Sequence, residues 1–313
     1  MSAKILDGLA LSKKIRNEIK ERLESRTEKY LINCNQKIHL RTMPPPCLAV
    51  LLCSEDPASA IYVKKKQEAC LEAGIISTII KPFQNGIENY DDPMGELFSL
   101  IDWINEDCSI HGIIVQLPLP KSINQYEIFD CINPLKDVDV FSPENVGLLQ
   151  QGRPRFVPCT PAAIQEILIR NGISFDGKKV AIINRSDVVG KPLHSLLIQN
   201  NDQANATITM CHDRTTPERL KQVCLASDII VVAVGKPNFL TADMVSDGAI
   251  VIDVGINHLK SSKKIVGDVD FESVSKKASW ITPVPGGIGP MTVTMLLKNT
   301  VLAQELLVSA SCS

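Results

Sequence analysis

The sequence predicts an α/β protein of two domains, each built around a parallel sheet. Apolar runs rich in Val and Ile alternate with amphipathic segments of helical spacing, which is typical of strands covered on both faces. This alternation occurs in two separate blocks, and the 313 residues are enough for two domains of ordinary size. Apolar residues make up 44% and charged residues 22%, which excludes a wholly disordered chain.

The first block contains alternating predicted helices and strands. Apolar residues between positions 9 and 28 recur at mostly helical spacing, so we expect a helix there. The segment 29–46 loses that pattern and ends in three prolines, so it is predicted to be a loop or linker. The remaining predicted elements are strands over 47–53, 76–83 and 112–120 and helices over 59–73 and 94–105.

The second block begins after Cys159 and continues the same alternation. Its predicted elements are helices over 162–170 and 192–199 and strands over 179–184, 206–210, 226–235 and 248–257. We therefore predict a domain boundary near Pro158. A last helix, over about 293–310, is expected to return to the first domain, because the second domain already has its helices.

Charge and cysteine content exclude several classes of partner. Lys and Arg number 33 and Asp and Glu 35, so there is no basic excess to attract nucleic acid or anionic lipid. No run approaches the roughly 20 apolar residues that span a bilayer, and the N-terminal segment resembles no targeting signal. None of the ten cysteines forms a CxxC pair, which argues against a zinc site. We expect a cytoplasmic, metal-free protein with mostly buried, reduced thiols.

The segment 179–197 reads as a strand, a turn and a helix, which is the arrangement of a nucleotide-binding turn. Asn184, Arg185 and Ser186 follow the strand, Gly190 permits a close backbone approach, and Pro192 suits a first helical turn. The N–H groups at the start of such a helix can bind a pyrophosphate. Only one glycine is present, so an ordinary strand-to-helix turn is the alternative interpretation.

The end of the next predicted strand bears on the choice of dinucleotide. An acid at this position binds a ribose 2′-hydroxyl, whereas a base accommodates a 2′-phosphate. The sequence has both, Asp213 and Arg214, so the choice between NAD and NADP stays open at this point. His212 is interpreted as structural or cofactor-flanking and not as a catalytic base, because no partner carboxylate or nucleophile is implied by the spacing.

Candidate catalytic residues gather in the first block. Ser59, Tyr62 and Lys66 have the i, i+3, i+7 spacing that places them on one helix face. A charged surface beside a half-buried tyrosine is the alternative. Polar residues at strand ends and in loops are expected to open to the same cleft, and these are Gln116, Asp137, Asp139 and Cys159.

The segment 282–292 is unusually rich in Gly and Pro. Pro283, Pro285, Gly286, Gly289 and Pro290 all fall within it, so we predict neither helix nor strand there. A rigid loop of this kind can lie against a flat ligand. A turn that connects two domains is the alternative.

Taken together, these motifs resemble the bifunctional methylenetetrahydrofolate dehydrogenase/methenyltetrahydrofolate cyclohydrolase family. They occur in the family's order over nearly the whole chain, as SxxYxxxK at 59–66, VQLPLP at 115–120, KDVD at 136–139, PCTP at 158–161, RSDVVGKP at 185–192, CHDRT at 211–215 and TPVPGGIGPMT at 282–292. The resemblance implies a folate-binding catalytic domain at 1–158, with the last helix, and a Rossmann-like NAD(P)-binding domain at 159–292.

The resemblance also implies roles for individual residues. Lys66 matches the lysine needed for the cyclohydrolase step, Gln116 the glutamine that tunes it, and Tyr62 and Asp139 the residues that hold the folate. The substrate pocket is implied to include Ser59, Tyr62, Leu117, Asp139, Cys159, Pro285, Gly286 and Gly289. The cofactor contacts are implied to include Asn184, Arg185, Ser186, Gly190, Pro192, Asp213, Arg214 and Ile256.

The implied function is oxidation of 5,10-methylenetetrahydrofolate by NADP, followed by hydrolysis to 10-formyltetrahydrofolate, in one-carbon metabolism and purine biosynthesis. The family forms homodimers, and NAD is the possible second cofactor. Alternatives are a monofunctional NAD-dependent dehydrogenase, a silent scaffold and a folate-independent dehydrogenase. Presence of both Lys66 and Gln116 argues against the first.

Three positions depart from the family pattern: Asn184 and Val140 stand where glycine is usual, and Asp213 replaces a residue that is often serine or a base. Asp213 weakens the NADP assignment. We expect Asp213 to turn away from the ribose site and to pair with Arg214 or solvent, which leaves Arg185 for the 2′-phosphate and favours NADP.

Overall fold

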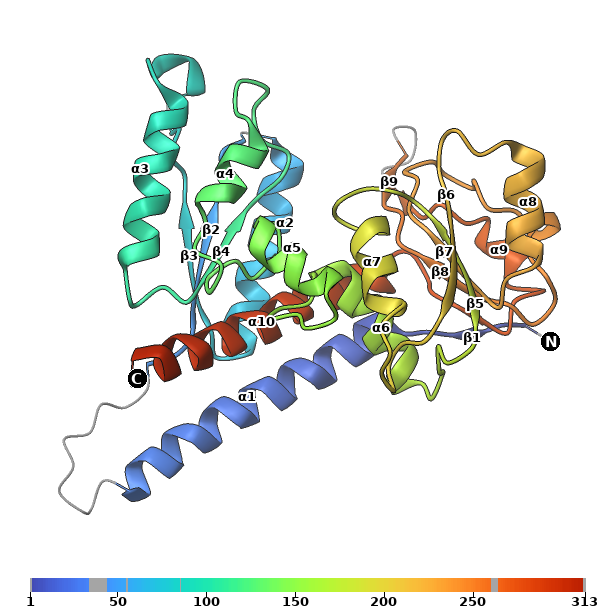
Figure 1. The fold of residues 1–313 in the computed structure, drawn as a ribbon, viewed down its shortest axis with the longest axis horizontal. Coiled ribbons are helices and arrows are strands. Elements are labelled where there is room, and N and C mark those ends of the chain that lie inside the picture. The colour runs from blue at the N-terminus through green and yellow to red at the C-terminus, as the bar shows by residue number, and fades with distance from the viewer. Residues whose placement is uncertain (1, 34–43, 55, 85, 260–263, 312–313) are drawn as a thin grey trace. The chain divides into compact units, whose positions relative to one another are not determined.

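The computed structural model describes residues 2–33, 44–54, 56–84, 86–259 and 264–311 (Figure 1). The chain divides into two compact units. The first unit comprises residues 1–12 and 148–295 and contains the expected nucleotide-binding turn, from which it takes the name nucleotide unit. The second comprises 13–147 and 296–313 and is named the folate unit after the substrate site expected in it. Each unit is described by itself.

The folate unit contains a parallel sheet with strand order β3-β2-β4. The strands are β2 (Cys47–Leu51), β3 (Ile76–Ile80) and β4 (Gly112–Val115). The helices between and after them are α2 (Pro57–Glu72), α3 (Pro93–Glu106), α4 (Gln125–Cys131) and α5 (Pro143–Gln150), with a 3-10 turn at Ile87–Asn89. Figure 1 shows α3 and α2 on opposite sides of these strands. Parallel strands need such helical crossovers.

The core of the folate unit explains its helices. Apolar residues of α3 recur at helical spacing, and Leu97, Ile101 and Ile104 are fully buried against alternate residues of β2 and β4. The side chain of Asp92 caps the start of α3 by accepting a hydrogen bond from the Gly95 N–H at 3.0 Å. The other end is capped by buried Lys136, whose ammonium donates to the last carbonyls of the helix.

Two long helices, α1 (Gly8–Asn33) and α10 (Ile288–Ser311), each run through the division between the units. Within the folate unit they are joined by ion pairs from Arg22 and Arg26 to Glu305. Asn299 of α10 donates to the Val138 carbonyl oxygen at 2.9 Å, across 161 residues of sequence. The C-terminal helix therefore completes the folate unit from residue 296 onwards.

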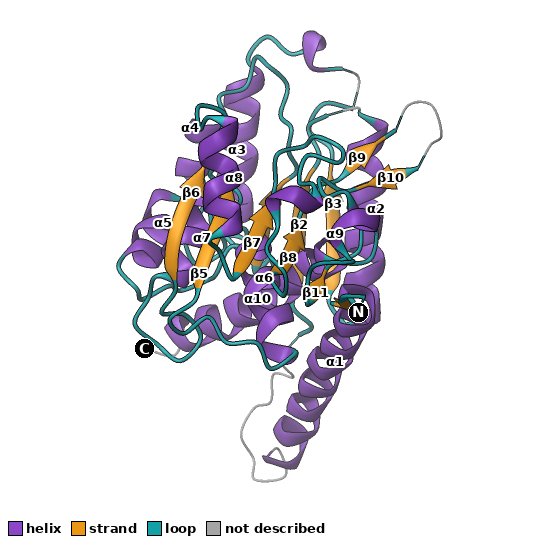
Figure 2. Cartoon of the chain, turned by 90° about the vertical axis from the view of Figure 1, so that its right-hand side faces the viewer, coloured by secondary structure: helices purple, strands orange, loops and turns teal. Residues whose placement is uncertain are grey.

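The nucleotide unit contains a parallel sheet with strand order β1-β11-β8-β7-β5-β6 (Figure 2). The strands are β5 (Lys179–Ile183), β6 (Thr207–Cys211), β7 (Ile229–Val232), β8 (Ile250–Asp253), β11 (Trp280–Ile281) and β1 (Lys4–Ile5). The helices are α6 (Cys159–Arg170), α7 (Gly190–Leu197), α8 (Pro217–Leu225) and α9 (Phe271–Val274), with a 3-10 turn at Ala242–Met244. A small antiparallel ribbon pairs β9 (Asn257–His258) with β10 (Ile265–Val266).

The order of the strands indicates where a ligand can bind to this sheet. The chain goes from β5 to β6 on one side of β5, and then crosses to β7 on the other side. In open parallel sheets, ligands bind beyond the carboxyl ends of the strands at such a reversal. Here that position lies just after Ile183 of β5 and Val232 of β7, both of which are buried.

The structure corrects several expectations about local structure. The first helix continues to Asn33, into the segment predicted to be a loop, and residues 34–43 lie outside the described residues. The Gly/Pro segment is a loop only to Gly287, because α10 begins at Ile288 and Pro290 occupies its first turn, where a missing N–H costs nothing. The predicted strand 112–120 ends at Val115, before its prolines.

The units also divide the chain differently from the predicted domains. The division falls between residues 147 and 148 instead of at 158, and residues 1–12 lie in the nucleotide unit. The physical cause is strand pairing, because Lys4 and Ile5 of β1 add to the edge of the sheet beside β11. Side chains at the end of α5 and beyond also bond within this unit, as Gln150 does with Ser195 at 2.6 Å.

The described cysteines are free thiols, and most of them are buried, as the sequence predicted. No helix within the described residues is both long enough and apolar enough to cross a bilayer.

Candidate functional site

The face of α2 that carries Ser59, Tyr62 and Lys66 meets the end of β4. The Lys66 ammonium nitrogen donates to Oε1 of Gln116 at 2.9 Å, and Gln116 Nε2 donates to the Leu117 carbonyl oxygen at 2.8 Å. The backbone N–H of Gln116 bonds to the Leu51 carbonyl, which continues the sheet for one more residue. Gln116 is therefore held at both ends, and it fixes the position of the Lys66 amine.

Lys66 and Gln116 are both partly exposed, so the amine is held but remains accessible to a bound molecule. A glutamine amide carries no charge. The Gln116 oxygen can therefore orient the amine without forming an ion pair that would keep it permanently protonated. A positioned amine of this kind is able to move a proton to or from a bound molecule.

Tyr62 offers a half-buried ring one turn before Lys66 on the same helix. Burial raises the pKa of the Tyr62 phenol, which keeps it neutral in the physiological range. The Lys65 ammonium lies 5.9 Å from the centre of the ring, and Lys65 itself is exposed. Tyr62 therefore presents a flat, neutral surface of the kind that stacks on aromatic ligands.

Asp137 and Asp139 have different roles, although the sequence placed both at the cleft. The buried Asp137 carboxylate accepts the backbone N–H groups of Val140, Phe141 and Ser142 at 2.8–3.1 Å. The Asp137 carboxylate therefore bonds to the backbone of the turn, and the expectation that it opens to a cleft is wrong. Asp139 is half-buried and lies within the turn that Asp137 organises.

A hollow of about 390 Å³ follows Gln116 along the chain. Its lining includes Leu117, which the resemblance places in the substrate pocket, and the residues at the start of α4. The full lining consists of Leu117, Pro118, Leu119, Pro120, Lys121, Ile123, Asn124, Gln125 and Tyr126. Helix α4 was not predicted from the sequence, so this hollow was not foreseen.

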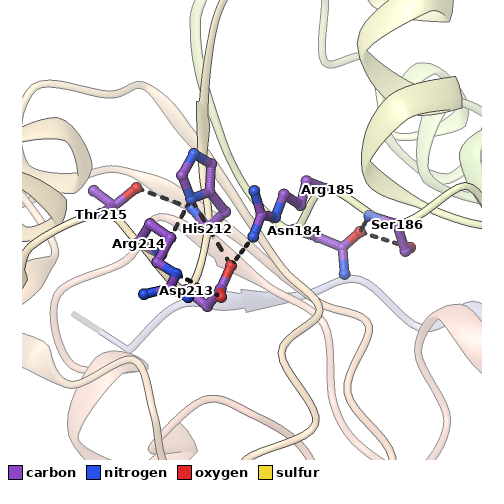
Figure 3. Close-up of polar contacts among 7 residues, drawn as sticks. All are labelled: Asn184, Arg185, Ser186, His212, Asp213, Arg214 and Thr215. Carbon is purple, nitrogen blue, oxygen red and sulfur yellow. Dashed lines mark hydrogen bonds and ion pairs between the residues drawn. The ribbon is translucent and has the colours of Figure 1, made fainter.

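In the nucleotide unit, the side chain of Asn184 organises the turn after β5. Its oxygen accepts the N–H and the hydroxyl of Ser186, each at 2.7 Å (Figure 3). The same oxygen accepts the N–H of Gly190 at 2.9 Å. Its nitrogen donates to the Ala233 carbonyl oxygen at 2.6 Å. Asn184 therefore links the ends of β5 and β7 at the reversal of strand order.

These bonds correct the expectation that the start of α7 offers free N–H groups. The Gly190 N–H already bonds to Asn184, and the Val189 N–H bonds to the Ser186 hydroxyl at 3.1 Å. Glycine is required at position 190 because a Cβ there would lie 2.3 Å from the Asn184 carbonyl oxygen. Pro192 is buried in the first turn of this helix.

Asp213, Arg185 and Arg214 form a charged cluster beyond the ends of β5 and β6 (Figure 3). The Asp213 carboxylate accepts a hydrogen bond from the Arg185 guanidinium, and Nε of Arg214 lies 3.7 Å from its other oxygen. The expected approach of Asp213 to Arg214 is present, but the expectation that Arg185 is left for a phosphate is wrong. Arg185 has a carboxylate partner within its own chain.

His212 lies beside this cluster in its neutral form. Its Nδ1 accepts the Arg214 backbone N–H at 3.1 Å, so Nδ1 carries no proton. Nδ1 also lies 3.9 Å from the Asp213 carboxylate, but an unprotonated nitrogen forms no ion pair there. These contacts support the interpretation of His212 as structural.

Two buried carboxylates, which sequence reasoning missed, hold the loops after β7 and β8. Asp268 accepts the backbone N–H groups of residues 234–236 at 2.6–2.9 Å. Asp253 accepts those of Gly255, Asp268 and Val269, each at 2.9 Å. Ile256, an expected cofactor contact, lies within one of these loops and is 41% exposed. The motif DVGIN contained a signal for Asp253, because an acid at the carboxyl end of a buried strand is a site candidate, whereas Asp268 follows the short, partly buried β10.

The remaining predicted substrate residues lie in the nucleotide unit. Cys159 is buried at the start of α6, and Pro285 and Gly286 lie in the loop before α10. That loop packs on the start of α1, where the Leu9 N–H donates to the Gly286 carbonyl at 2.8 Å. A Cβ on Gly8 would lie 1.9 Å from the Gly287 carbonyl oxygen, so this close approach requires glycine. Gly289 is the second residue of α10.

The structure thus joins some predicted site residues directly, namely Lys66 with Gln116, Asn184 with Ser186, and Arg185 with Asp213. Ser59, Tyr62 and Asp139 belong with Lys66 in the folate unit. Cys159 and the loop containing Pro285 belong with Arg185 in the nucleotide unit.

The fold and these sites define a two-domain α/β protein with a Rossmann-like nucleotide-binding domain. Two family models match the chain. Residues 6–139 match the tetrahydrofolate dehydrogenase/cyclohydrolase catalytic domain, and residues 158–307 match the NAD(P)-binding domain of the same family. The chain belongs to the tetrahydrofolate dehydrogenase/cyclohydrolase family.

Known relatives are similar over nearly their whole length. The bifunctional protein FolD of Campylobacter curvus is 50% identical over 302 residues, which cover 96% of each chain. The crystal structure of the bifunctional enzyme FolD, a methylenetetrahydrofolate dehydrogenase/cyclohydrolase from Campylobacter jejuni, has a TM-score of 0.84 and 45% identity, and the match covers 97% of this chain and 99% of that one. The Trypanosoma brucei dehydrogenase-cyclohydrolase complexed with NADP and inhibitor has a TM-score of 0.84 and 34% identity, covering 98% and 99%.

Proposed function

We propose that this protein oxidises 5,10-methylenetetrahydrofolate to 5,10-methenyltetrahydrofolate with NADP and hydrolyses that product to 10-formyltetrahydrofolate. The observation that carries the proposal is the hydrogen bond between Lys66 and Gln116, because it positions an amine for proton transfer on a chain of this family. The similar enzyme from Campylobacter jejuni is described as having both activities, which supports the assignment.

The nucleotide unit has the side chains that an NADP molecule requires. Arg185 and Arg214 carry exposed guanidinium groups suited to a phosphate, and the Asn184 turn lies at the reversal of strand order. The cofactor-binding residues that we propose are Asn184, Arg185, Ser186, Gly190, Pro192, Asp213, Arg214 and Ile256. When bound, NADP accepts the hydride that leaves the methylene bridge of the folate. The similar Trypanosoma brucei enzyme was solved with NADP, which supports this cofactor.

For the first reaction, the chain needs to position the folate and requires no strong acid or base. Tyr62 stacks on the aromatic part of the folate, and Asp139 accepts hydrogen bonds from its pterin edge. Orientation of two flat rings supplies most of the rate enhancement in such a transfer. The proposed substrate-binding residues are Ser59, Tyr62, Leu117, Asp139, Cys159, Pro285, Gly286 and Gly289.

The second reaction requires proton transfer. Water adds to the methenyl carbon and loses a proton, which leaves a hydroxyl on that carbon. A carbon–nitrogen bond of the ring then breaks as its nitrogen takes up a proton, and the hydroxyl loses its proton as the formyl C=O forms, so that one proton is released overall. The Lys66 amine, held by Gln116, is placed to move protons in these steps. Lys66 and Gln116 therefore serve the hydrolysis more than the oxidation.

An assay of the purified protein tests the proposal. Supplied with methylenetetrahydrofolate and NADP, the protein is expected to form the methenyl product and NADPH, and to hydrolyse separately added methenyltetrahydrofolate. Formation of NADPH without hydrolysis would favour the monofunctional dehydrogenase. Failure of both reactions would contradict the proposal.

We further propose the setting that accompanies these activities in the family. The protein is expected to act in the cytoplasm as a homodimer that associates through the nucleotide domain, and to supply 10-formyltetrahydrofolate for purine biosynthesis. No nucleic acid or membrane partner is expected from its near-neutral charge balance. The mass of the protein in solution, measured by light scattering, tests the dimer.

A further inference from the structure

We propose that Asp213 is a specificity residue that reduces the preference for NADP over NAD. Its carboxylate pairs with the Arg185 guanidinium, which a 2′-phosphate requires as its own partner. The inference rests on the proposed use of a dinucleotide at this site. Beyond that function, it states that one side chain, Asp213, weakens the binding of NADP.

The position of Asp213 follows from the topology. It comes two residues after the end of β6, the second strand of the β5–α7–β6 unit. In dinucleotide-binding folds, the side chains at this strand end face the adenosine ribose. Arg185 reaches the same place from the turn after β5, so an acid and a base meet where the 2′-substituent of the ribose lies (Figure 3).

Two arginines and one histidine surround the Asp213 side chain. Arg185 and Arg214 approach its two carboxylate oxygens, and His212 is neutral because its Nδ1 accepts a backbone N–H. Among the residues that the structure describes, these are the ionisable side chains within ion-pair distance of Asp213. Asp213 therefore has one guanidinium group beside each of its two side-chain oxygens.

NAD and NADP differ at this place by one phosphate. The Asp213 carboxylate interacts favourably with the 2′-hydroxyl of NAD and unfavourably with the 2′-phosphate of NADP. A 2′-hydroxyl can donate a hydrogen bond to the carboxylate, which leaves the contact with Arg185 intact. A 2′-phosphate is itself an anion that pairs with Arg185, so it must displace the carboxylate and remain close to it. The same side chain therefore assists NAD and opposes NADP.

The ion pair is exposed enough to be displaced. The side chains of Arg185 and Asp213 are 52% and 65% exposed, and ion pairs on a protein surface are individually weak. NADP binding is consequently reduced and not prevented. The protein is expected to use both cofactors. The difference in affinity between NADP and NAD should be smaller than Arg185 and Arg214 would give without Asp213.

Substitution of Asp213 by Asn tests this inference, because it removes the charge and keeps the shape of the side chain. We expect the ratio of kcat/KM for NADP to kcat/KM for NAD to rise about tenfold, equivalent to about 1.4 kcal/mol. The ratio of dissociation constants, measured by titration calorimetry without folate, should move by the same factor. Asp213→Glu keeps the charge and should stay within about threefold of the wild type.

Asp243→Asn is the matched control. Asp243 is 64% exposed, pairs with Lys221 at 2.5 Å and lies in the same unit, so its loss changes net charge equally without touching the cluster. We expect the cofactor ratio of this variant to equal that of the wild type.

The outcomes distinguish this inference from the proposed function. Cofactor binding that shifts with Asp213→Asn supports the inference even if no folate is oxidised, a result that would contradict only the proposed function. An unchanged cofactor ratio in Asp213→Asn, or an equal shift in Asp243→Asn, would overturn the inference while leaving the activity assignment intact.

Discussion

Asn184 stands where the family pattern has glycine, and its side chain shows what a single residue adds to the nucleotide turn. One oxygen takes up the N–H groups of Ser186 and Gly190, and one nitrogen reaches the carbonyl of Ala233. The turn is therefore pre-formed without a ligand. The sequence identified the position as a departure but could not show these bonds, because the Ala233 contact depends on the pairing of β5 with β7.

Val140 replaces a second family glycine, and it does so in a backbone conformation that suits glycine. Its φ is 67°, a region that costs an L-residue about 1–2 kcal/mol. The three N–H bonds to Asp137 hold the turn in this form. The departure noted in the sequence thus places a β-branched side chain in a strained backbone conformation.

We expect glycine to be tolerated better than alanine at position 140. Val140→Ala and Val140→Gly both lose the buried side chain, but only glycine relieves the positive φ. Val140→Gly should therefore be more stable than Val140→Ala by about 1 kcal/mol, the lower end of that strain. Denaturant unfolding of both variants measures the difference, and a more stable alanine variant would show that the turn is unstrained.

Tyr62 is expected to contribute to folate binding through its ring and not through its hydroxyl. Tyr62→Ala removes a stacking surface and should weaken folate binding by about 1–3 kcal/mol, by analogy with bases stacked on aromatic residues. Tyr62→Phe keeps the ring and should have a smaller effect. The Michaelis constants for methylenetetrahydrofolate give the comparison, and equal values in wild type and both variants would mean that Tyr62 only packs.

At the scale of elements, amphipathic helices and buried strands were predicted well, since each carries its own periodic signal. Helix α2 was expected over 59–73 and runs over Pro57–Glu72, so the shared face of Tyr62 and Lys66 followed directly. Strands β1 and β11 were missed because two residues carry no period, and these strands are defined by their pairing, β1 with β11 and β11 with β8. The start of α10 was missed because Pro and Gly suit a first helical turn as well as a loop.

The loops after β7 and β8 depend on one titrating group, and this predicts a pH dependence. Burial raises the pKa of Asp253 from 3.8 to about 6, although three backbone N–H donors oppose the shift. A raised folded-state pKa means that the folded protein binds more protons between pH 4 and 6. The stability that Asp253 contributes is therefore fully present below about pH 4 and is lost as the pH rises through 6.

The Asp253→Asn variant, which cannot titrate, isolates this contribution. The free energy of unfolding of the wild type minus that of the variant should fall by about 3 kcal/mol between pH 4 and pH 7, since two pKa units correspond to about that amount. Ionisable groups that do not interact with Asp253 cancel in this difference. A constant difference across the range would mean that Asp253 titrates normally.

At the scale of the whole molecule, the division into two units separates the two kinds of chemistry. The Lys66–Gln116 pair that we propose for proton transfer lies in the folate unit, and the Asn184 turn that we propose for cofactor binding lies in the nucleotide unit. The sequence indicated both groups, because Lys66 shares a predicted helix face with Tyr62, and Gln116 and Asn184 each follow a predicted strand. It could not assign residues 1–12 to the nucleotide unit or direct Asp213 to Arg185, because both depend on contacts between distant segments.

Because the residues proposed for hydrolysis and for cofactor binding lie in different units, one substitution should be able to remove hydrolysis and keep oxidation. Lys66→Met removes the amine and retains a side chain of similar length, and neither Arg185 nor the Asn184 turn is altered. Lys64→Met, an exposed lysine of the same helix, is the matched control and should leave both activities unchanged.

The most direct measurement is the fate of the methenyl product in the purified Lys66→Met protein, supplied with methylenetetrahydrofolate and NADP. Methenyltetrahydrofolate should accumulate, with hydrolysis reduced at least about 100-fold, the lower range for loss of general acid–base catalysis. NADPH formation should persist at least in part. Hydrolysis of added methenyltetrahydrofolate by the variant at the wild-type rate would contradict the role of Lys66 and Gln116.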